Sequence, residues 1–162
     1  MKATHAMILT LGLLGCATLA ASAGEPKGKV AFDVYAGGYF VRNDAPIAGN
    51  PAFLVLPSKK SFDGVFGFGF VMGAKPKLVD NKLFDANLIA VVVKEGNAPT
   101  TYEVQKVERE KGRLVVHYKA TQKQATTARF RSPLILSVPR GDYAEIAFIE
   151  NGKEVGKAAV KK

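Results

Sequence analysis

The feature that most constrains the fold is a continuous apolar run, Asn-Leu-Ile-Ala-Val-Val-Val, at residues 87–93. Four of its seven residues are β-branched, and β-branched side chains favour the pleated, buried surface of a sheet. Strands buried within a sheet read as near-continuous hydrophobic runs of this kind. The run therefore predicts a central β-strand.

The rest of the chain alternates strand-like segments with turn signals. Glu110-Lys111-Gly112 is a plausible hairpin turn, and Asn151-Gly152 is the strongest turn signal in the sequence. The expected strands, besides the central one, are residues 29–35 (with 39–41 as a continuation), 52–56, 101–107, 113–120, 130–138, 145–150 and 155–160. About seven strands joined by short turns predict a mostly antiparallel sheet or sandwich.

One segment changes from a two-residue to a helical period. Phe62, Val65 and Phe66 are spaced i, i+3, i+4, and Ser58 is available as the N-cap. We therefore expect one short helix, packed against an edge or a face of the sheet, in a mainly β (α+β) fold. No repeat of 20–50 residues is visible.

The segment after this helix has two interpretations. In an extended conformation Phe66, Phe68 and Phe70 lie on one side, while Gly67 and Gly69 leave the other side bare. The bare backbone could admit a ligand or a partner strand. The simpler interpretation, which we favour, is that the three rings are buried beneath the sheet.

The amino terminus has the layout of a secretory signal peptide. Lys2 precedes an apolar stretch, and Ala21-Ser22-Ala23 is a small-x-small cleavage triplet. The apolar stretch is shorter than the roughly 20 residues that a membrane span needs. We expect a signal peptide at residues 1–23, one β-rich domain at residues 24–162, and a secreted or periplasmic protein.

A second processing site competes with the first. Leu13-Leu14-Gly15-Cys16 resembles the lipobox of bacterial lipoproteins, in which Cys16 becomes the lipidated first residue and anchors the chain to the cell envelope. Membrane association is expected only in that case. As the chain has one cysteine, it cannot close an internal disulfide, and no Cys/His set for zinc exists.

The chain is basic, with a formal net charge of +9, but its Lys and Arg residues are spread along the sequence. Proteins that bind nucleic acid usually concentrate such residues on one face or within a recognisable motif. No such motif is present, so we expect no nucleic-acid partner.

The residues that could support catalysis are few. After removal of the leader one histidine remains, His117, at an expected outward-facing strand position shared with Val115 and Lys119. The other face of the same strand carries Leu114, Val116 and Tyr118. Ser132, Ser137 and Asp142 lie on other segments, and a nucleophile–His–acid relay would need them within hydrogen-bond reach of His117. We expect no enzyme activity, no catalytic residue, no cofactor and no metal site.

Five segments together resemble the domain of the protease complex-associated polypeptide (PrcB-type) family of exported bacterial proteins. They are the helix at residues 58–66, the strand at 88–92, Ala-Pro-Thr-Thr-Tyr-Glu-Val at 98–104, Gly-Arg-Leu-Val-Val at 112–116 and the strand ending in Val138-Pro139. The resemblance covers roughly residues 52–149. In the loop, Thr100-Thr101 replaces the usual Thr-Gly-Gly stretch of that family.

The resemblance implies a non-enzymatic protein that associates with a secreted protease, or another envelope protein, and stabilises or modulates it. Residues 96–101 connect two expected strands and form either a simple hairpin linker or a recognition loop, since loops held by a rigid sheet are common recognition sites. The candidate partner contacts in and beside this loop are Pro99, Thr100, Thr101 and Tyr102. The alternative is an envelope-anchored structural or ligand-binding lipoprotein.

Overall fold

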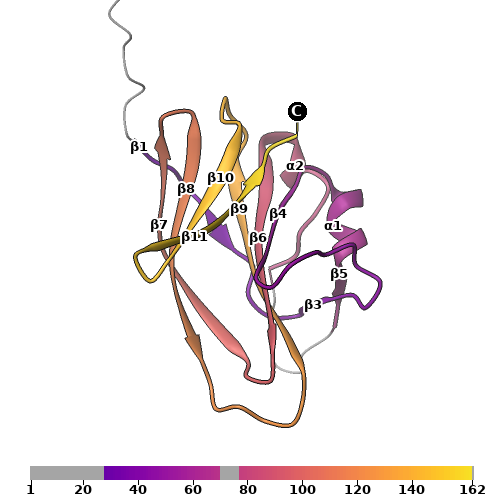
Figure 1. Ribbon diagram of the computed structural model, residues 1–162. Coiled ribbons are helices and arrows are strands. Elements are labelled where there is room, and N and C mark those ends of the chain that lie inside the picture. The colour runs from indigo at the N-terminus through magenta and orange to yellow at the C-terminus, as the bar shows by residue number, and fades with distance from the viewer. Residues whose placement is uncertain (1–27, 70–76, 162) are drawn as a thin grey trace, which may run out of the picture.

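A computed structural model describes residues 28–69 and 77–161. Two β-sheets pack face to face, and a third layer of helices and short strands covers the outer face of one of them (Figure 1). Sheet A has the strand order β1 (Gly28–Lys29), β7 (Thr100–Glu110), β8 (Arg113–Gln122), β10 (Glu145–Glu150), β11 (Lys153–Ala159). Its pairs are antiparallel except for β8 and β10, which run parallel.

Sheet B has the order β2 (Asp33–Val34), β9 (Phe130–Pro139), β6 (Asn87–Gly96), β4 (Ala52–Leu56), and all of its pairs are antiparallel. The predicted central strand is confirmed, because β6 lies between β9 and β4 and its residues 88–93 are all buried. The apolar run is continuous because sheet B is covered on both faces.

The space between the two sheets holds the larger core. Alternate residues of each strand point into it, as the two-residue period of a strand requires. The predicted face of β8 is confirmed: Leu114, Val116 and Tyr118 are buried there. They pack with the inward residues of the facing and neighbouring strands, which are Leu88, Ala90, Val92, Leu134, Leu136, Val138, Ile146 and Phe148.

The other face of sheet B is covered by α1 (Lys59–Val65), by the pair β3 (Tyr39–Val41) and β5 (Phe66–Phe68), and by α2 (Leu83–Ala86). The predicted helix and its cap are confirmed, since the Ser58 hydroxyl accepts a hydrogen bond from the Ser61 N–H at 3.2 Å. Phe62 is buried at the centre of this layer, with its ring 5.0 Å from that of Phe66.

Two tight turns fix the strand register of sheet A. Lys111-Gly112 joins β7 to β8 with φ values of 46° and 73°, and Asn151-Gly152 joins β10 to β11 with 50° and 85°. Positive φ at both central residues is the signature of the type I′ turn, whose twist matches that of a hairpin. Both hairpin predictions are confirmed.

The prediction of a single strand at residues 29–35 is wrong. This segment forms β1 in sheet A and β2 in sheet B: the Val30 N–H donates to the Val107 carbonyl, and the Tyr35 N–H donates to the Ile135 carbonyl. Alternation of polar and apolar residues indicates a locally extended chain, but it does not indicate which strand, or which sheet, each residue pairs with. The prediction of a single helix is also wrong, because α2 is a second helix.

Seven of the eleven strands described have five or more residues, in agreement with the expected number, and β1, β2, β3 and β5 have two or three. The burial predicted after the helix is confirmed for Phe66, while Phe68 is half-buried and Phe70 lies outside the described residues. Gly67 is not bare: a Cβ built there would lie 2.3 Å from Cζ of Phe40. The predicted signal peptide and Cys16 also lie outside the described residues.

Candidate functional site

A groove of about 340 Å³ lies between the beginning of β7 and the middle of β9. Residues 100–102 form one wall and residues 133–135 the facing wall, and the connection from β2 to β3 contributes residues 34–37 and Tyr39. Val34 is 39 % exposed here, one of three large hydrophobic side chains exposed among the described residues. We call this cavity the β7–β9 groove.

The β9 wall is a strand edge that β2 covers only in part. Pairing between the two strands runs over Ser137 and Leu136 and ends where Tyr35 donates to the Ile135 carbonyl. Residues two apart on a strand direct their backbone groups to the same side. Pro133 therefore occupies the next position on this edge, where its missing N–H leaves no donor unpaired.

The β7 wall is an edge with backbone groups that no described strand pairs. β1 pairs with β7 only as far as the hydrogen bond from Val30 to Val107. A bulge at Gln105 shifts the register, so that the groups of Val104 and Tyr102 face away from β8. The Thr100 N–H points the same way and donates to the Ser132 hydroxyl at 2.9 Å. No described segment pairs with the backbone of Tyr102 and Val104.

The predicted contact residues lie at this edge, and three of them, Thr100, Thr101 and Tyr102, line the groove. They belong to β7, so the connection between β6 and β7 is only residues 97–99 and the expected longer loop is wrong. Thr101 is exposed, but Thr100 is buried and the Tyr102 hydroxyl donates to the Ser132 carbonyl at 2.9 Å. The carbonyl of Pro99 accepts from the Lys123 N–H, and Pro99 does not line the groove.

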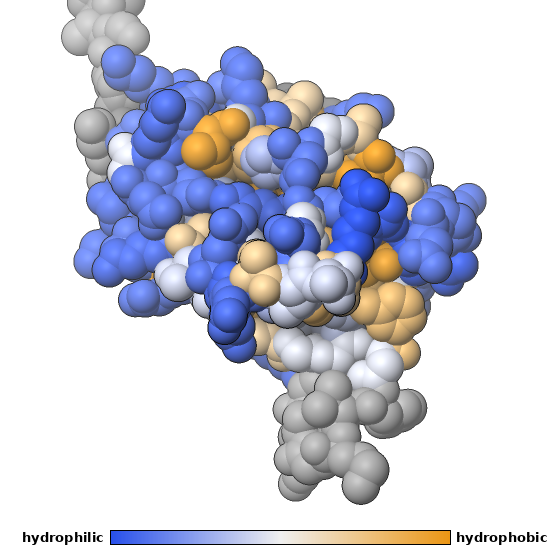
Figure 2. All heavy atoms as spheres, turned by 60° about the horizontal axis from the view of Figure 1, so that its bottom comes forward, coloured by the Kyte–Doolittle hydropathy of each residue, from blue (hydrophilic) through white to orange (hydrophobic). Residues whose placement is uncertain are grey.

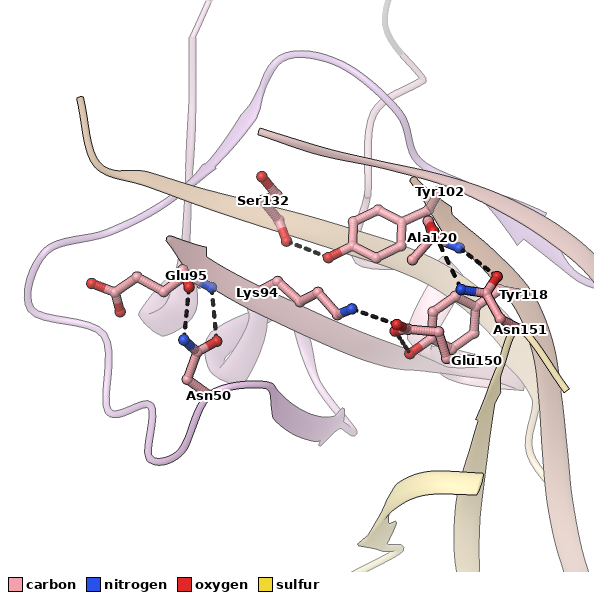
Figure 3. Close-up of polar contacts among 9 residues, drawn as sticks. All are labelled: Asn50, Lys94, Glu95, Tyr102, Tyr118, Ala120, Ser132, Glu150 and Asn151. Carbon is pink, nitrogen blue, oxygen red and sulfur yellow. Dashed lines mark hydrogen bonds and ion pairs between the residues drawn. The ribbon is translucent and has the colours of Figure 1, made fainter. Parts of the chain in front are cut away.

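Behind Tyr102 a partly buried polar network joins the two sheets (Figure 3). Lys94 of β6 lies 2.5 Å from one carboxylate oxygen of Glu150 in β10, and the Tyr118 hydroxyl donates to the other oxygen at 3.0 Å. The side chains of Lys94 and Glu150 are only 20 % and 14 % exposed. The Tyr102 and Tyr118 rings meet edge to face at 5.9 Å, so the network also braces the β7 wall of the groove.

The two tyrosines of this network are held neutral. Burial raises the pKa of Tyr102 and of Tyr118 far above the usual value, and the negative charge of Glu150 raises both further. Neutral phenols donate hydrogen bonds, which suits a positioning role. Sequence reasoning missed Lys94 and Glu150, because the only signal is a charged residue at the end of an apolar strand, which is also what a solvated strand end looks like.

His117 lies on the outward face of sheet A, as expected, but it is less exposed than a solvent-facing residue. Its side chain is 24 % exposed, and Nε2 is buried 3.4 Å from a carboxylate oxygen of Glu108, a contact that is an ion pair only when the ring is protonated. Val115 on the same face is fully buried.

The two serines weighed as nucleophiles belong to sheet B, across the core from His117. The Ser132 hydroxyl is held by the Thr100 N–H, and Ser137 alternates with the core-facing Leu136 and Val138. Within residues 28–69 and 77–161, no group of three His, Cys, Asp or Glu side chains is arranged to hold a metal ion.

The end of the molecule that carries the β6–β7 and β8–β9 connections is mostly hydrophilic, with small separated hydrophobic areas (Figure 2). Of the two helices in the described part of the chain, neither has the length and apolar character that a membrane span needs. Comparison with protein-family models, curated proteins and solved structures found no match, so the resemblance to the PrcB-type domain remains a prediction.

Proposed function

We propose that this chain is an exported, non-enzymatic binding protein that holds an extended segment of a partner protein at the β7–β9 groove. The partner class is an extracytoplasmic protease or another envelope protein, which the chain stabilises or modulates. The observation that carries the proposal is the unpaired backbone edge of β7 beside a groove.

The β7 edge suits strand addition. Tyr102 and Val104 each present one N–H and one C=O to an incoming extended segment, and main-chain hydrogen bonds supply affinity in this mode of recognition. Each such bond contributes roughly 0.5–1.5 kcal/mol net. The edge is short, because β1 occupies it from Val107 onwards and the bulge at Gln105 interrupts it. A partner segment of four or five residues is therefore the expected length.

The groove supplies selectivity. Alternate side chains of an added strand point to opposite faces, so every second side chain of the partner would enter the groove. There they meet the apolar surfaces of Val34 and Leu134 and the rim of Tyr102. Small apolar or aromatic side chains at alternate positions fit such a lining.

Export and the protease partner rest on the leader-like residues 1–23 and on the family resemblance. Mass spectrometry of the protein recovered outside the cytoplasm tests the first point. A mature chain that begins at Gly24 supports secretion, an acylated Cys16 supports the envelope-anchored alternative, and an intact leader contradicts both.

The binding test uses the full tagged chain expressed in its own cells, cross-linked, captured and quantified by mass spectrometry. Thr101→Trp places a large ring on the outward side of the β7 wall, beside the edge that an added strand would occupy. Val104→Pro removes one edge donor that faces away from β8, without breaking the β7–β8 ladder. Thr121→Trp is the matched control, because Thr121 pairs with Thr101 on the same exposed face but does not line the groove.

We expect one or a few extracytoplasmic proteins whose recovery falls about ten-fold or more with either β7-edge variant and stays within about two-fold with the control. The recovered partner is then assayed for proteolysis with and without the chain. Equal recovery by all four proteins would show that the groove is not the binding surface.

A further inference from the structure

A second cavity, of about 320 Å³, opens at the opposite end of β7 and β9 from the groove. Its apolar surface comes from Val30, Ala31, Leu114, Pro139 and Tyr143, and three positively charged residues, Lys29, Arg109 and Arg140, line it as well. We call it the Arg109 cavity. Small-molecule sites typically begin at roughly 300 Å³ and combine an apolar lining with a few polar groups, so this cavity is at the lower end of that range.

Arg109 is held in place by a ring and by backbone rather than by a carboxylate of the described residues. Its guanidinium carbon lies 5.8 Å from the centre of the Tyr143 ring. It also lies over Gly141, where a Cβ would come within 2.6 Å of Nη2. Arg109 shares the inward side of β7 with Val107, whereas Glu108 and Glu110 alternate to the outward side. No described carboxylate forms an ion pair or hydrogen bond with it.

Arg140 adds a second positive charge that neutral groups hold. Its guanidinium donates to the carbonyl oxygens of Phe84 at 3.0 Å and of Pro57 at 2.6 Å. Carbonyl acceptors fix the orientation of the guanidinium but leave its charge uncompensated. Asp142, the nearest acid in the sequence, is exposed and does not line the cavity. The described residues that line the cavity include no acidic side chain, so the field they produce there is positive.

We propose that the Arg109 cavity binds a small organic anion that carries a carboxylate or phosphate head and a short apolar body. The guanidinium of Arg109 pairs with the head, and Val30, Leu114 and Pro139 contact the body. This site is distinct from the β7–β9 groove and its existence does not depend on the function proposed for the groove.

The chemistry of the cavity favours this class over two neighbouring ones. A planar guanidinium presents paired donors that match a carboxylate or a phosphate, and a bidentate pair adds geometric selectivity. An apolar cation would face two arginines. A bare inorganic anion would leave the apolar lining in contact with water, so it gains only the electrostatic part of the binding energy.

The test is a titration of the full chain with octanoate, octyl phosphate, acetate, inorganic phosphate and octylamine, followed by ¹H–¹⁵N NMR. We expect saturable shifts at the amides of Val30, Gly141 and Tyr143 with the first two ligands. Each buried methylene should tighten binding up to about four-fold, so octanoate should bind far more tightly than acetate. Octylamine should produce no saturable shift.

Arg109→Gln should raise the dissociation constant of octanoate about ten-fold or more. Lys119→Gln is the matched control, since it removes one positive charge at an exposed position outside the cavity, and it should leave the constant within about two-fold. Sedimentation with phosphatidylglycerol vesicles distinguishes a lipid head group from a free ligand: Arg109-dependent vesicle binding identifies the former.

Four results would overturn the proposal. They are saturable binding of octylamine, equal affinity for acetate and octanoate, an unchanged constant in Arg109→Gln, or the absence of saturable binding by every anion and vesicle tested. Circular dichroism of Arg109→Gln separates loss of the site from loss of the fold, and Gly141→Ala supplies a second variant, because it displaces the guanidinium while leaving its charge in the chain.

Discussion

Breaking the ion pair between Lys94 and Glu150 should destabilise the protein by about 3 kcal/mol, and removing both charges should cost much less. At an effective dielectric constant near 20, two charges 2.5 Å apart attract with roughly 6–7 kcal/mol. Desolvation costs several kcal/mol for each ion, so the net contribution of the intact pair is small. Removal of one partner leaves the other desolvated and uncompensated, which typically costs 3–5 kcal/mol.

The lower end of that range applies here, because an open cavity reaches both side chains and water can partly solvate a remaining charge. For Lys94→Met the Tyr118 hydroxyl still donates to Glu150 and offsets part of the loss. For Glu150→Leu the ammonium of Lys94 loses its acceptor. The double variant replaces both ions by apolar side chains, so its cost should stay below the sum of the singles by about 2 kcal/mol or more.

The assay is urea unfolding at pH 7 with linear extrapolation, applied to the two single variants and the double variant. The matched control is the exposed pair Lys157–Glu145, whose atoms are 2.9 Å apart but whose side chains are 61 % and 29 % exposed. The same cycle there should give a coupling below about 1 kcal/mol. Additive costs at Lys94 and Glu150, within about 0.5 kcal/mol, would refute the reasoning, because they would mean that water screens this pair as well.

Three further outcomes are expected. Burial raises the pKa of Tyr102 and Tyr118 in the folded state, so the unfolded chain ionises first as the pH rises above about 10. Each tyrosine therefore lowers the free energy of unfolding by about 1.4 kcal/mol per pH unit in that range. Tyr118→Phe should make the fall in stability at alkaline pH, measured by urea unfolding, less steep. Gly156→Ala places a Cβ 2.2 Å from the Phe53 ring, which packs on Phe148, and should lower the free energy of unfolding by about 1–3 kcal/mol. Gly67→Ala meets only the exposed end of Phe40 and should lower it by less. Equal decreases in the thermal unfolding midpoint of the two variants would contradict this. Phe62→Ala should cost about 3–5 kcal/mol by urea unfolding, because its ring contacts those of Tyr39, Phe66 and Phe84, and a loss under 1 kcal/mol would mean that the third layer is not part of the core.

Features encoded within a few neighbouring residues could be predicted from the sequence. The type I′ turns at Lys111-Gly112 and Asn151-Gly152, the cap at Ser58 and the apolar run of β6 each depend on local backbone preferences or on a local period. Their positions then set the inward face of β8, which was predicted correctly.

Features that depend on which distant segments meet could not be predicted. The parallel pair β8 and β10 is one, since residues 123–144 separate them in the sequence and include β9, a strand of the other sheet. The ion pair between Lys94 and Glu150 is another, because it joins strands of different sheets. A pattern that repeats every two residues indicates which face of its sheet each side chain is on. It does not indicate which distant residue that side chain contacts.

The groove itself follows from the pairing of the segment at residues 28–35. The sequence predicted residues 29–35 as a single strand continued by residues 39–41; the latter instead form β3, which pairs with β5. Residues 28–35 reach from β7 of sheet A to β9 of sheet B, so β1 and β2 are each only two residues long. A single seven-residue strand would have covered one edge fully and left the other open. The crossing instead pairs with both edges at one end, and at the other end no described strand pairs with the edges at Tyr102, Val104 and Pro133, next to the groove. The segment that closes the sandwich on this side therefore also fixes where an added strand could bind and how long it could be.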